Sequence, residues 1–139
     1  MINQITSKIA MCEAQEVTVY NLANGAAKFD CILNLHHQEF TGEKELCANL
    51  GIKYIWQPVP RKRSHTTEAM KKDLRIAADL LEILVKHYNR IIVHCQGSVD
   101  RAPFVVSKYL SNVAYLTMPQ AYRIVKQQRK ETCEHYEWI

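Results

Sequence analysis

Two side chains that could do chemistry, Cys95 and Arg101, lie six positions apart in the stretch IIVHCQGSVDRAP at positions 91–103. The apolar residues before the cysteine predict a buried strand, and Pro103 suits the first turn of a following helix. A loop of this length between a strand and a helix can turn its backbone N–H groups around one tetrahedral anion. The positive end of the helix dipole adds to that attraction, so the spacing predicts an anion-binding loop.

Cys95 stands at the base of this loop, where a thiolate is favoured, and it is therefore a candidate nucleophile. A cysteine after an apolar strand can also be an inert core residue, but Arg101 and the glycine in the loop favour the catalytic interpretation. The arginine can bind two oxygens of a phosphate group at once. The residues that would surround the phosphate are Gln96, Gly97, Ser98, Val99, Asp100 and Arg101.

The composition is that of an ordinary soluble domain. The chain has 139 residues, 47% of them apolar and 23% charged, which suits a single domain over residues 1–139 with one core. No apolar run approaches about 20 residues, and the N-terminus lacks the pattern of a secretory signal, so we expect neither a membrane span nor export. The formal net charge of +4 suits an anionic substrate.

Five cysteines occur at irregular spacing, namely Cys12, Cys31, Cys47, Cys95 and Cys133. Their number is odd and there is no CxxC pair, so the sequence predicts no zinc site. Cys31 and Cys47 are expected to be inert core residues. A reducing cytoplasm is the expected location, and a regulatory disulfide to Cys95 is left open.

The spacing of apolar residues predicts alternating strands and helices. Strands are expected at 5–11, 29–35, 52–56 and 90–94. Helices are expected at 43–50, 68–88, 102–112 and 118–130, and residues 16–29 fit either element. Thr67 and Thr117 are the predicted N-caps of two helices, and Gly51 is predicted to end another.

This order predicts an α/β fold with a mostly parallel central sheet of about four or five strands, flanked by helices. Ligands in such folds bind at the carboxyl ends of the strands, where the loop after His94 lies. Tyr136 and Trp138 are expected to pack on the body of the domain. Arg129 is expected to anchor the last helix to the sheet.

The stretch HCQGSVDRAP resembles the signature of the cysteine-dependent protein tyrosine phosphatases, in which a His-Cys pair is followed by five residues and an arginine. The order of segments is similar to that of the small dual-specificity branch of this superfamily. The segments that carry the likeness are FDCILNL, GIKYIWQPVP, IIVHC, SKYL and QAYRIVKQQR followed by HYEWI. The resemblance covers nearly the whole chain and implies a protein tyrosine phosphatase-like fold.

The resemblance implies a two-step reaction that needs no metal or other cofactor. Cys95, as a thiolate, would attack phosphorus and form a phosphocysteine, which water would then hydrolyse. Arg101 and the amides of residues 96–101 would hold the equatorial oxygens in the transition state. His94 would tune the thiolate through hydrogen bonds; its alternative interpretation is a buried histidine with a purely structural role.

Two loop positions depart from the family pattern. Ser98 stands where the family usually has glycine, although some cysteine-dependent phosphatases with a rhodanese-like fold also have serine there. Ala102 stands where the family commonly has a serine or threonine, whose hydroxyl assists release of the cysteine from phosphate. The methyl group of alanine cannot do this, so slow turnover of the intermediate is expected.

A third departure concerns the general acid, which in the family is usually an aspartate at the position that Arg61 occupies here. A missing general acid costs roughly 10²–10⁴ in rate for poor leaving groups. His65 and Glu68 are candidate replacements, and so is Asp100, which resembles an aspartate assigned the acid role in the myotubularin and Sac-type lipid phosphatases. The alternative for Asp100 is a carboxylate that orients Arg101 or caps the helix.

Arg61, Lys62 and Arg63 form a basic run beside the predicted site. Such a run either forms ordinary solvated surface or attracts a polyanionic substrate. The candidate polyanions are a phosphopeptide with acidic flanks, an inositol phosphate and an RNA 5′ end. The sequence thus predicts a phosphomonoester hydrolase, foremost a protein tyrosine or dual-specificity phosphatase acting on phosphorylated proteins. The alternatives are a phosphoinositide phosphatase, an RNA 5′-triphosphatase, and a pseudophosphatase that binds phosphorylated partners.

Overall fold

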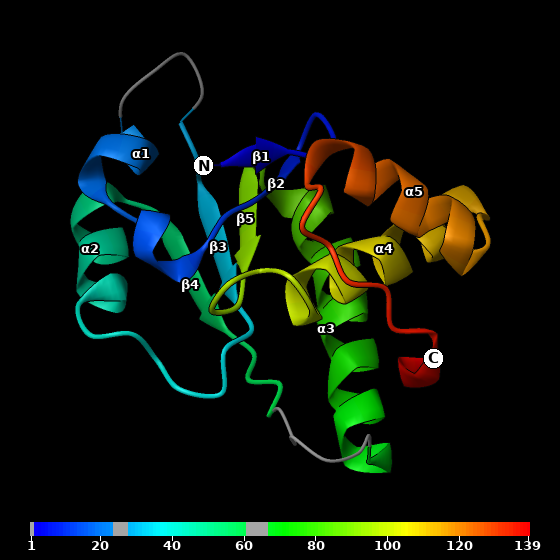
Figure 1. Cartoon of the computed structure of the whole chain (residues 1–139). Coiled ribbons are helices and arrows are strands. Elements are labelled where there is room, and N and C mark those ends of the chain that lie inside the picture. Colours follow the sequence, from blue (N-terminus) through cyan, green and yellow to red (C-terminus); the bar gives the residue numbers. More distant parts are fainter. Residues whose placement is uncertain (1, 24–27, 61–66) are drawn as a thin grey trace.

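The central sheet is formed by the strands β1 (Asn3–Gln4), β2 (Ile9–Met11), β3 (Cys31–Asn34), β4 (Lys53–Trp56) and β5 (Ile91–His94). The computed structural model describes residues 2–23, 28–60 and 67–139 (Figure 1). The strand order is β1-β2-β5-β3-β4. All neighbouring pairs in this order are parallel except β1 and β2, so the predicted mostly parallel sheet is confirmed.

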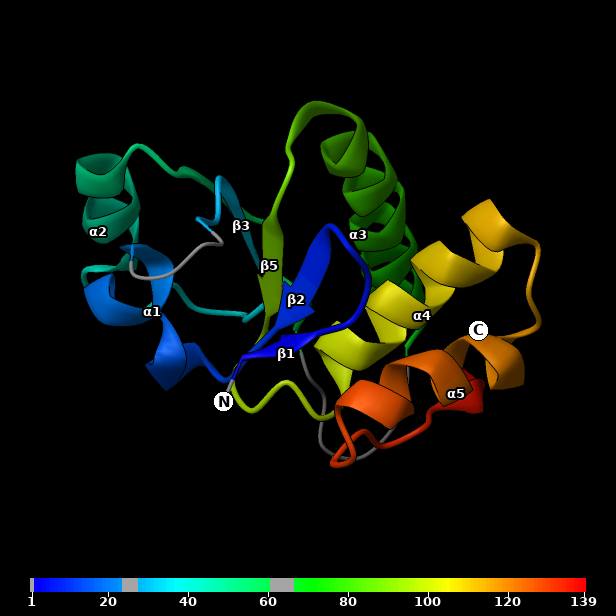
Figure 2. The same ribbon diagram turned by 90° about the horizontal axis from the view of Figure 1, so that it is seen from above.

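Helices lie on both sides of the sheet (Figure 2). One side carries α1 (Val19–Ala23) and α2 (Glu43–Leu50). The other side carries α3 (Glu68–His87), α4 (Arg101–Ala114) and α5 (Met118–Gln128). Short 3₁₀ helices occur at η1 (Ala14–Glu16) and η2 (Tyr136–Trp138).

The middle strand β5 shows why the sheet is apolar on both faces. Ile91 and Val93 belong to the core cluster beneath α3, α4 and α5, whereas Ile92 packs with Ile32 of β3 in the cluster beneath α1 and α2. A parallel strand that is covered on both faces has a continuous apolar sequence rather than an alternating one.

The predicted helix ends are confirmed. The Thr67 side chain accepts a hydrogen bond from the Met70 N–H at 3.1 Å, and Thr117 forms a capping box with Gln120. Gly51 ends α2 in the left-handed conformation at a φ of 70°. A left-handed residue carries no Cβ penalty when it is glycine, so this residue stops the helix at little cost.

The prediction for the first strand needs correction, and that for the last aromatic residues is confirmed. Within the range 5–11 the strand is Ile9–Met11, because the Thr6 hydroxyl accepts hydrogen bonds from the N–H groups of Lys8 and Ile9 and turns the chain between β1 and the antiparallel β2. Trp138 is buried, and Tyr136, although 42% exposed, packs edge-on against Tyr122 of α5, so both residues pack on the body of the domain as predicted.

The basic run and one of the candidate acids cannot be placed. The predictions for Arg61, Lys62, Arg63 and His65 lie outside the described residues. In the part of the chain that the structure describes, no helix has both the length and the hydrophobicity needed to cross a lipid bilayer.

Candidate active site

The loop between β5 and α4 lies at the carboxyl end of β5, as predicted (Figure 1). Cys95 follows directly after the strand, and Arg101 is the first residue of the helix. Both residues are buried, and the Arg101 guanidinium donates a hydrogen bond through Nη1 to the Val59 carbonyl at 3.0 Å. The two candidate side chains are thus positioned by regular elements at the two ends of one loop.

Arg129 supports this loop from the end of α5. Its guanidinium donates to the carbonyl oxygens of Gly97 at 2.8 Å and Ser98 at 2.7 Å, and also to Asn3 Oδ1 on β1 at 2.7 Å. Arg129 therefore joins the end of the last helix to the sheet, as predicted. It also fixes two peptide units of the loop, which the sequence did not indicate.

The neighbouring loop carbonyls are bound by backbone N–H groups. The Gln96 carbonyl accepts from Ala14 at 2.8 Å, and the Val99 carbonyl accepts from Cys133 at 2.9 Å. Four consecutive carbonyls, from residue 96 to residue 99, are therefore tied to other segments. Because the N–H of a trans peptide points opposite to its C=O, the N–H groups of residues 97–100 are turned away from those segments. This arrangement can hold an anion.

Ser98 has the left-handed conformation that the family's glycine would adopt easily, with a φ of 51°. Such a conformation costs a residue with a Cβ roughly 1–2 kcal/mol. The serine side chain is buried: its Oγ donates to the Cys12 carbonyl at 2.5 Å, accepts from the Cys95 N–H at 3.2 Å, and lies 4.0 Å from Cys95 Sγ. These hydrogen bonds offset the backbone strain and connect the loop to β2.

His94 is held at both ring nitrogens. Nδ1 lies 2.8 Å from the Cys95 carbonyl, to which it donates, and Nε2 lies 2.5 Å from Glu43 Oε1 at the start of α2. The pair is buried, and Glu43 Oε2 has no hydrogen-bond partner among the described residues. These contacts agree with a role of His94 in positioning Cys95. Glu43 lies 51 positions from His94 in the sequence, so no local pattern could identify it.

Asp100 contacts the C-terminal segment of the chain. Its Oδ1 lies 2.7 Å from His135 Nε2, and His135 Nδ1 lies 2.6 Å from Glu137 Oε1. The hydrogen bond from His135 lowers the pKa of Glu137. Asp100 is the N-cap residue of α4 but makes no side-chain capping hydrogen bond, so the helix-capping alternative is wrong.

Three further cysteines are buried in the core. Burial raises the pKa of Cys12 and of Cys31 to about 12, and that of Cys47 to about 11, which keeps all three as thiols at neutral pH. Cys31 and Cys47 are therefore the inert core residues that the sequence predicts. Cys133 is exposed, and all five cysteines, each within the described residues, are free.

A cavity of about 410 Å³ lies beside the loop, with Gln96 in its wall. Its apolar lining comes from η1, α2 and the segment before α2. The lining residues are Ala14, Gln15, Val17, Phe40, Thr41, Gly42, Glu43, Leu46 and Gln96.

The remaining predicted acid, Glu68, begins α3 and lies 3.6 Å from Lys71 within the same helix. Its carboxylate is strongly exposed. Across the described ranges, no group of three or more His, Cys, Asp or Glu side chains is arranged to hold a metal ion.

Comparisons with known proteins agree on one family. The family model described as "Dual specificity phosphatase, catalytic domain" matches residues 5–139. Dual specificity protein phosphatase 5 of Rattus norvegicus is 26% identical over 108 residues, and Dual specificity protein phosphatase 26 of Bos taurus is 32% identical over 101 residues. These alignments cover 75% and 70% of this chain but only 27% and 46% of the relatives, so the chain spans a quarter to a half of their length.

The fold comparison points the same way. The crystal structure of human DUSP28 superposes with a TM-score of 0.76 at 16% sequence identity, covering 99% of this chain and 86% of that one. At this identity the likeness establishes the shared fold.

Proposed function

The chain belongs to the dual specificity phosphatase family, and on that premise we propose that it hydrolyses phosphomonoesters through a phosphocysteine intermediate. The proposed substrates are phosphorylated proteins, with phosphotyrosine foremost and phosphoserine or phosphothreonine in addition. The observation that supports this proposal most directly is the loop of residues 96–100, in which four consecutive carbonyls are bound by other segments and the amides are left for an anion.

In the first proposed step the Cys95 thiolate attacks phosphorus, and the bond between phosphorus and the ester oxygen breaks. The loop amides and Arg101 bind the equatorial oxygens, where charge shifts in the transition state. Asp100 gives a proton to the departing oxygen. The cavity beside Gln96 receives the group that carries this oxygen.

In the second proposed step water attacks the phosphocysteine, and the bond between sulfur and phosphorus breaks. Asp100 takes a proton from the water, and Cys95 leaves as a thiolate. Ala102 offers no hydroxyl to the departing sulfur, so this step is expected to limit turnover. The buried Ser98 hydroxyl, 4.0 Å from Sγ, is the nearest hydroxyl of the loop itself.

The test compares the wild type with Cys95→Ser on phosphotyrosine and phosphoserine peptides, a phosphoinositide and a 5′-triphosphorylated RNA. We expect hydrolysis of the phosphotyrosine peptide by the wild type and none by the variant. Cys133→Ser, which changes an exposed cysteine, is the matched control and should keep full activity.

The other outcomes of the same panel decide between functions. Activity that survives Cys95→Ser rejects the mechanism. Turnover confined to the phosphoinositide or to the RNA replaces the proposed substrate class. Binding of phosphopeptide without turnover by the wild type identifies a pseudophosphatase.

A second experiment addresses Asp100. If it protonates the leaving group, Asp100→Asn should slow hydrolysis of a phosphotyrosine peptide by roughly 10²-fold or more, and that of an activated aryl phosphate far less. Equal losses on the two substrates would rule out this role.

A further inference from the structure

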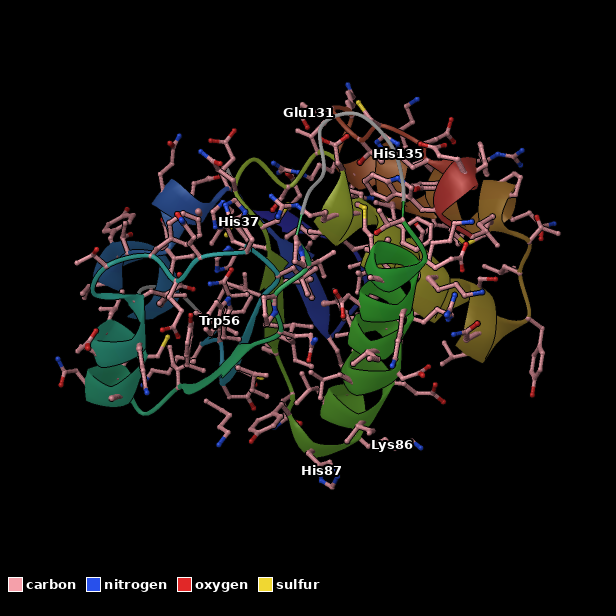
Figure 3. All side chains as sticks on the ribbon, turned by 90° about the horizontal axis from the view of Figure 1, so that it is seen from below. His37, Trp56, Lys86, His87, Glu131 and His135 are labelled. Carbon is pink, nitrogen blue, oxygen red and sulfur yellow. The ribbon has the colours of Figure 1, made fainter. Side chains whose placement is uncertain are left out.

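The C-terminal segment brings a histidine to the end of the anion-binding loop. Figure 3 shows His135 on this segment, beside the N-terminal end of α4. Its Nε2 lies 2.7 Å from Asp100 Oδ1, across 35 positions of sequence. The backbone supports the contact, because the N–H of Cys133 donates to the Val99 carbonyl in the loop.

The hydrogen bonds of His135 indicate which form of the ring is present. Nδ1 lies 2.6 Å from Glu137 Oε1, so each ring nitrogen faces a carboxylate oxygen. An ionised carboxylate only accepts hydrogen bonds, and both nitrogens of an imidazole can donate only when the ring is protonated. The arrangement therefore matches an imidazolium between two carboxylates. In agreement, the hydrogen bond from His135 lowers the pKa of Glu137.

The ring is also fixed in orientation. It stacks on Trp138 with 3.9 Å between centroids and an angle of 6° between planes. Trp138 itself packs edge-on against Phe104 of α4. The backbone N–H of His135 donates to the Tyr122 hydroxyl on α5 at 3.1 Å. A ring held in this way keeps Nε2 aimed at Asp100.

We propose that His135 is the proton source for the leaving group and acts through Asp100. This inference rests on the proposed function and deepens it. Asp100 Oδ1 accepts the hydrogen bond of Nε2 in this arrangement, so a proton that Asp100 passes to the leaving group must come from a second group. His135 supplies it from the C-terminal segment.

The proton transfers balance over the two steps. When Cys95 displaces the ester oxygen, the Nε2 proton of His135 passes to the Asp100 carboxylate and from Asp100 to that oxygen, so Asp100 ends the step without a proton. The ring becomes neutral and keeps its Nδ1 proton toward Glu137. When water attacks the phosphocysteine, its proton passes to Asp100 and on to Nε2, which restores the imidazolium and releases the Cys95 thiolate.

Access to water allows such a transfer. The side chains of His135 and Asp100 are 23% and 21% exposed, so the ring can exchange protons with solvent between turnovers. The titratable groups that form hydrogen bonds with His135 include Asp100 and Glu137, at the ring, and Tyr122, at the backbone N–H.

The test uses the full chain and a series of aryl phosphates from dinitrophenyl to phenyl phosphate. We expect His135→Gln, which retains a hydrogen-bond donor but cannot deliver a proton, to lower kcat/KM on phenyl phosphate by roughly 10²-fold or more. On dinitrophenyl phosphate, whose leaving group needs no proton, the loss should be at most about threefold. The matched control is His87→Gln, at the far end of α3 (Figure 3), which should match the wild type on both substrates.

Two further readouts separate proton transfer from a structural role. In the wild type, the alkaline limb of the pH profile of kcat/KM should be steeper for phenyl phosphate than for dinitrophenyl phosphate, and His135→Gln should remove that difference. The ¹⁵N signals of the His135 ring should show both nitrogens protonated at neutral pH, and Glu137→Gln should shift the ring toward the neutral form.

Several results overturn the inference. Equal losses of activity across the substrate series, an unchanged pH profile in His135→Gln, or a neutral His135 ring at neutral pH would each do so. If the wild type shows no hydrolysis that depends on Cys95, the proposed function itself fails. If Cys95-dependent hydrolysis persists while His135→Gln is indistinguishable from the wild type on phenyl phosphate, only the proton source is wrong.

Discussion

Two histidine–carboxylate pairs flank the same loop, one at each end, and they differ in their access to water. At the first end, His94 and Glu43 lie 2.5 Å apart with side chains 0% and 4% exposed. At the second end, His135 and Asp100 lie 2.7 Å apart with side chains 23% and 21% exposed. The distances are similar, so the difference in burial decides what each pair can do.

A buried pair fixes geometry, because moving either charge without the other is costly. His94 therefore serves to hold the Cys95 backbone. A pair that reaches water is worth little to stability, but it can gain and lose a proton within a reaction cycle. The loop thus combines a buried end, next to Cys95, with an end that is accessible to water, next to Arg101.

The largest expected effect breaks the buried pair. Glu43→Ala should lower the free energy of unfolding by roughly 3–5 kcal/mol, because it leaves His94 buried without its partner. Urea denaturation of both proteins measures the difference. Glu45→Ala, an exposed glutamate in the same first turn of α2, should change the free energy by less than about 0.5 kcal/mol. Similar losses of unfolding free energy in the two variants would mean that the contact between Glu43 and His94 does not stabilise the fold.

Next in size is the loss of the guanidinium that spans the middle of the loop. Arg129→Met should cost roughly 2–3 kcal/mol, since the carbonyls of Gly97 and Ser98 lose their donors. It should also weaken the binding of orthovanadate at the loop, measured by calorimetry. Arg123→Met, on the exposed face of α5, is the control. Unchanged vanadate affinity in Arg129→Met would show that the loop keeps its shape without this support.

A smaller effect concerns the strained residue between the two ends. Ser98→Gly should be more stable than Ser98→Ala by about 1 kcal/mol, because both lose the hydroxyl but only alanine keeps the cost of a Cβ at positive φ. Thermal unfolding of the two variants measures this difference directly. Alanine as the more stable of the two would contradict the left-handed conformation of residue 98.

The smallest expected effect on stability is at the exposed pair. His135→Gln should change the free energy of unfolding by less than about 1 kcal/mol, because solvent screens a partly exposed ion pair. The same urea experiment used for Glu43→Ala measures it. A loss as large as that of Glu43→Ala would erase the contrast between the two ends and would indicate that His135 is mainly structural.

Much of the fold could be predicted because its signals are local. The sequence predicted that a helix ends at Gly51 and that Thr67 caps another, and in the structure α2 ends at Gly51 and Thr67 caps α3. The strand expected at 5–11 is shorter, at Ile9–Met11, because the Thr6 hydroxyl bonds to nearby N–H groups and turns the chain before it. A side chain that bonds to nearby backbone N–H groups competes with strand pairing, and hydrophobic periodicity does not register it.

The residues of the candidate site also divide into those that a local sequence pattern identifies and those that it does not. Cys95 and Arg101 stand out from their spacing alone, since one loop carries both. Glu43 and His135 reach that loop only through the tertiary fold, over 51 and 35 positions of sequence. The ending HYEWI indicated packing by its aromatic residues, and that packing is what brings His135 to Asp100. The roles of Cys95, Arg101 and Asp100 stay predictions until the variants are measured.

One backbone contact offers a way to watch the loop without any substrate. The Cys133 N–H donates to the Val99 carbonyl at 2.9 Å, so this amide is protected from exchange only while the loop and the C-terminal segment stay in contact. The rate at which this amide takes up deuterium therefore measures how often the contact between the C-terminal segment and the loop opens. An oxyanion that binds to the loop amides should slow deuterium uptake at the Cys133 N–H, so exchange at this amide reports how much of the loop is occupied.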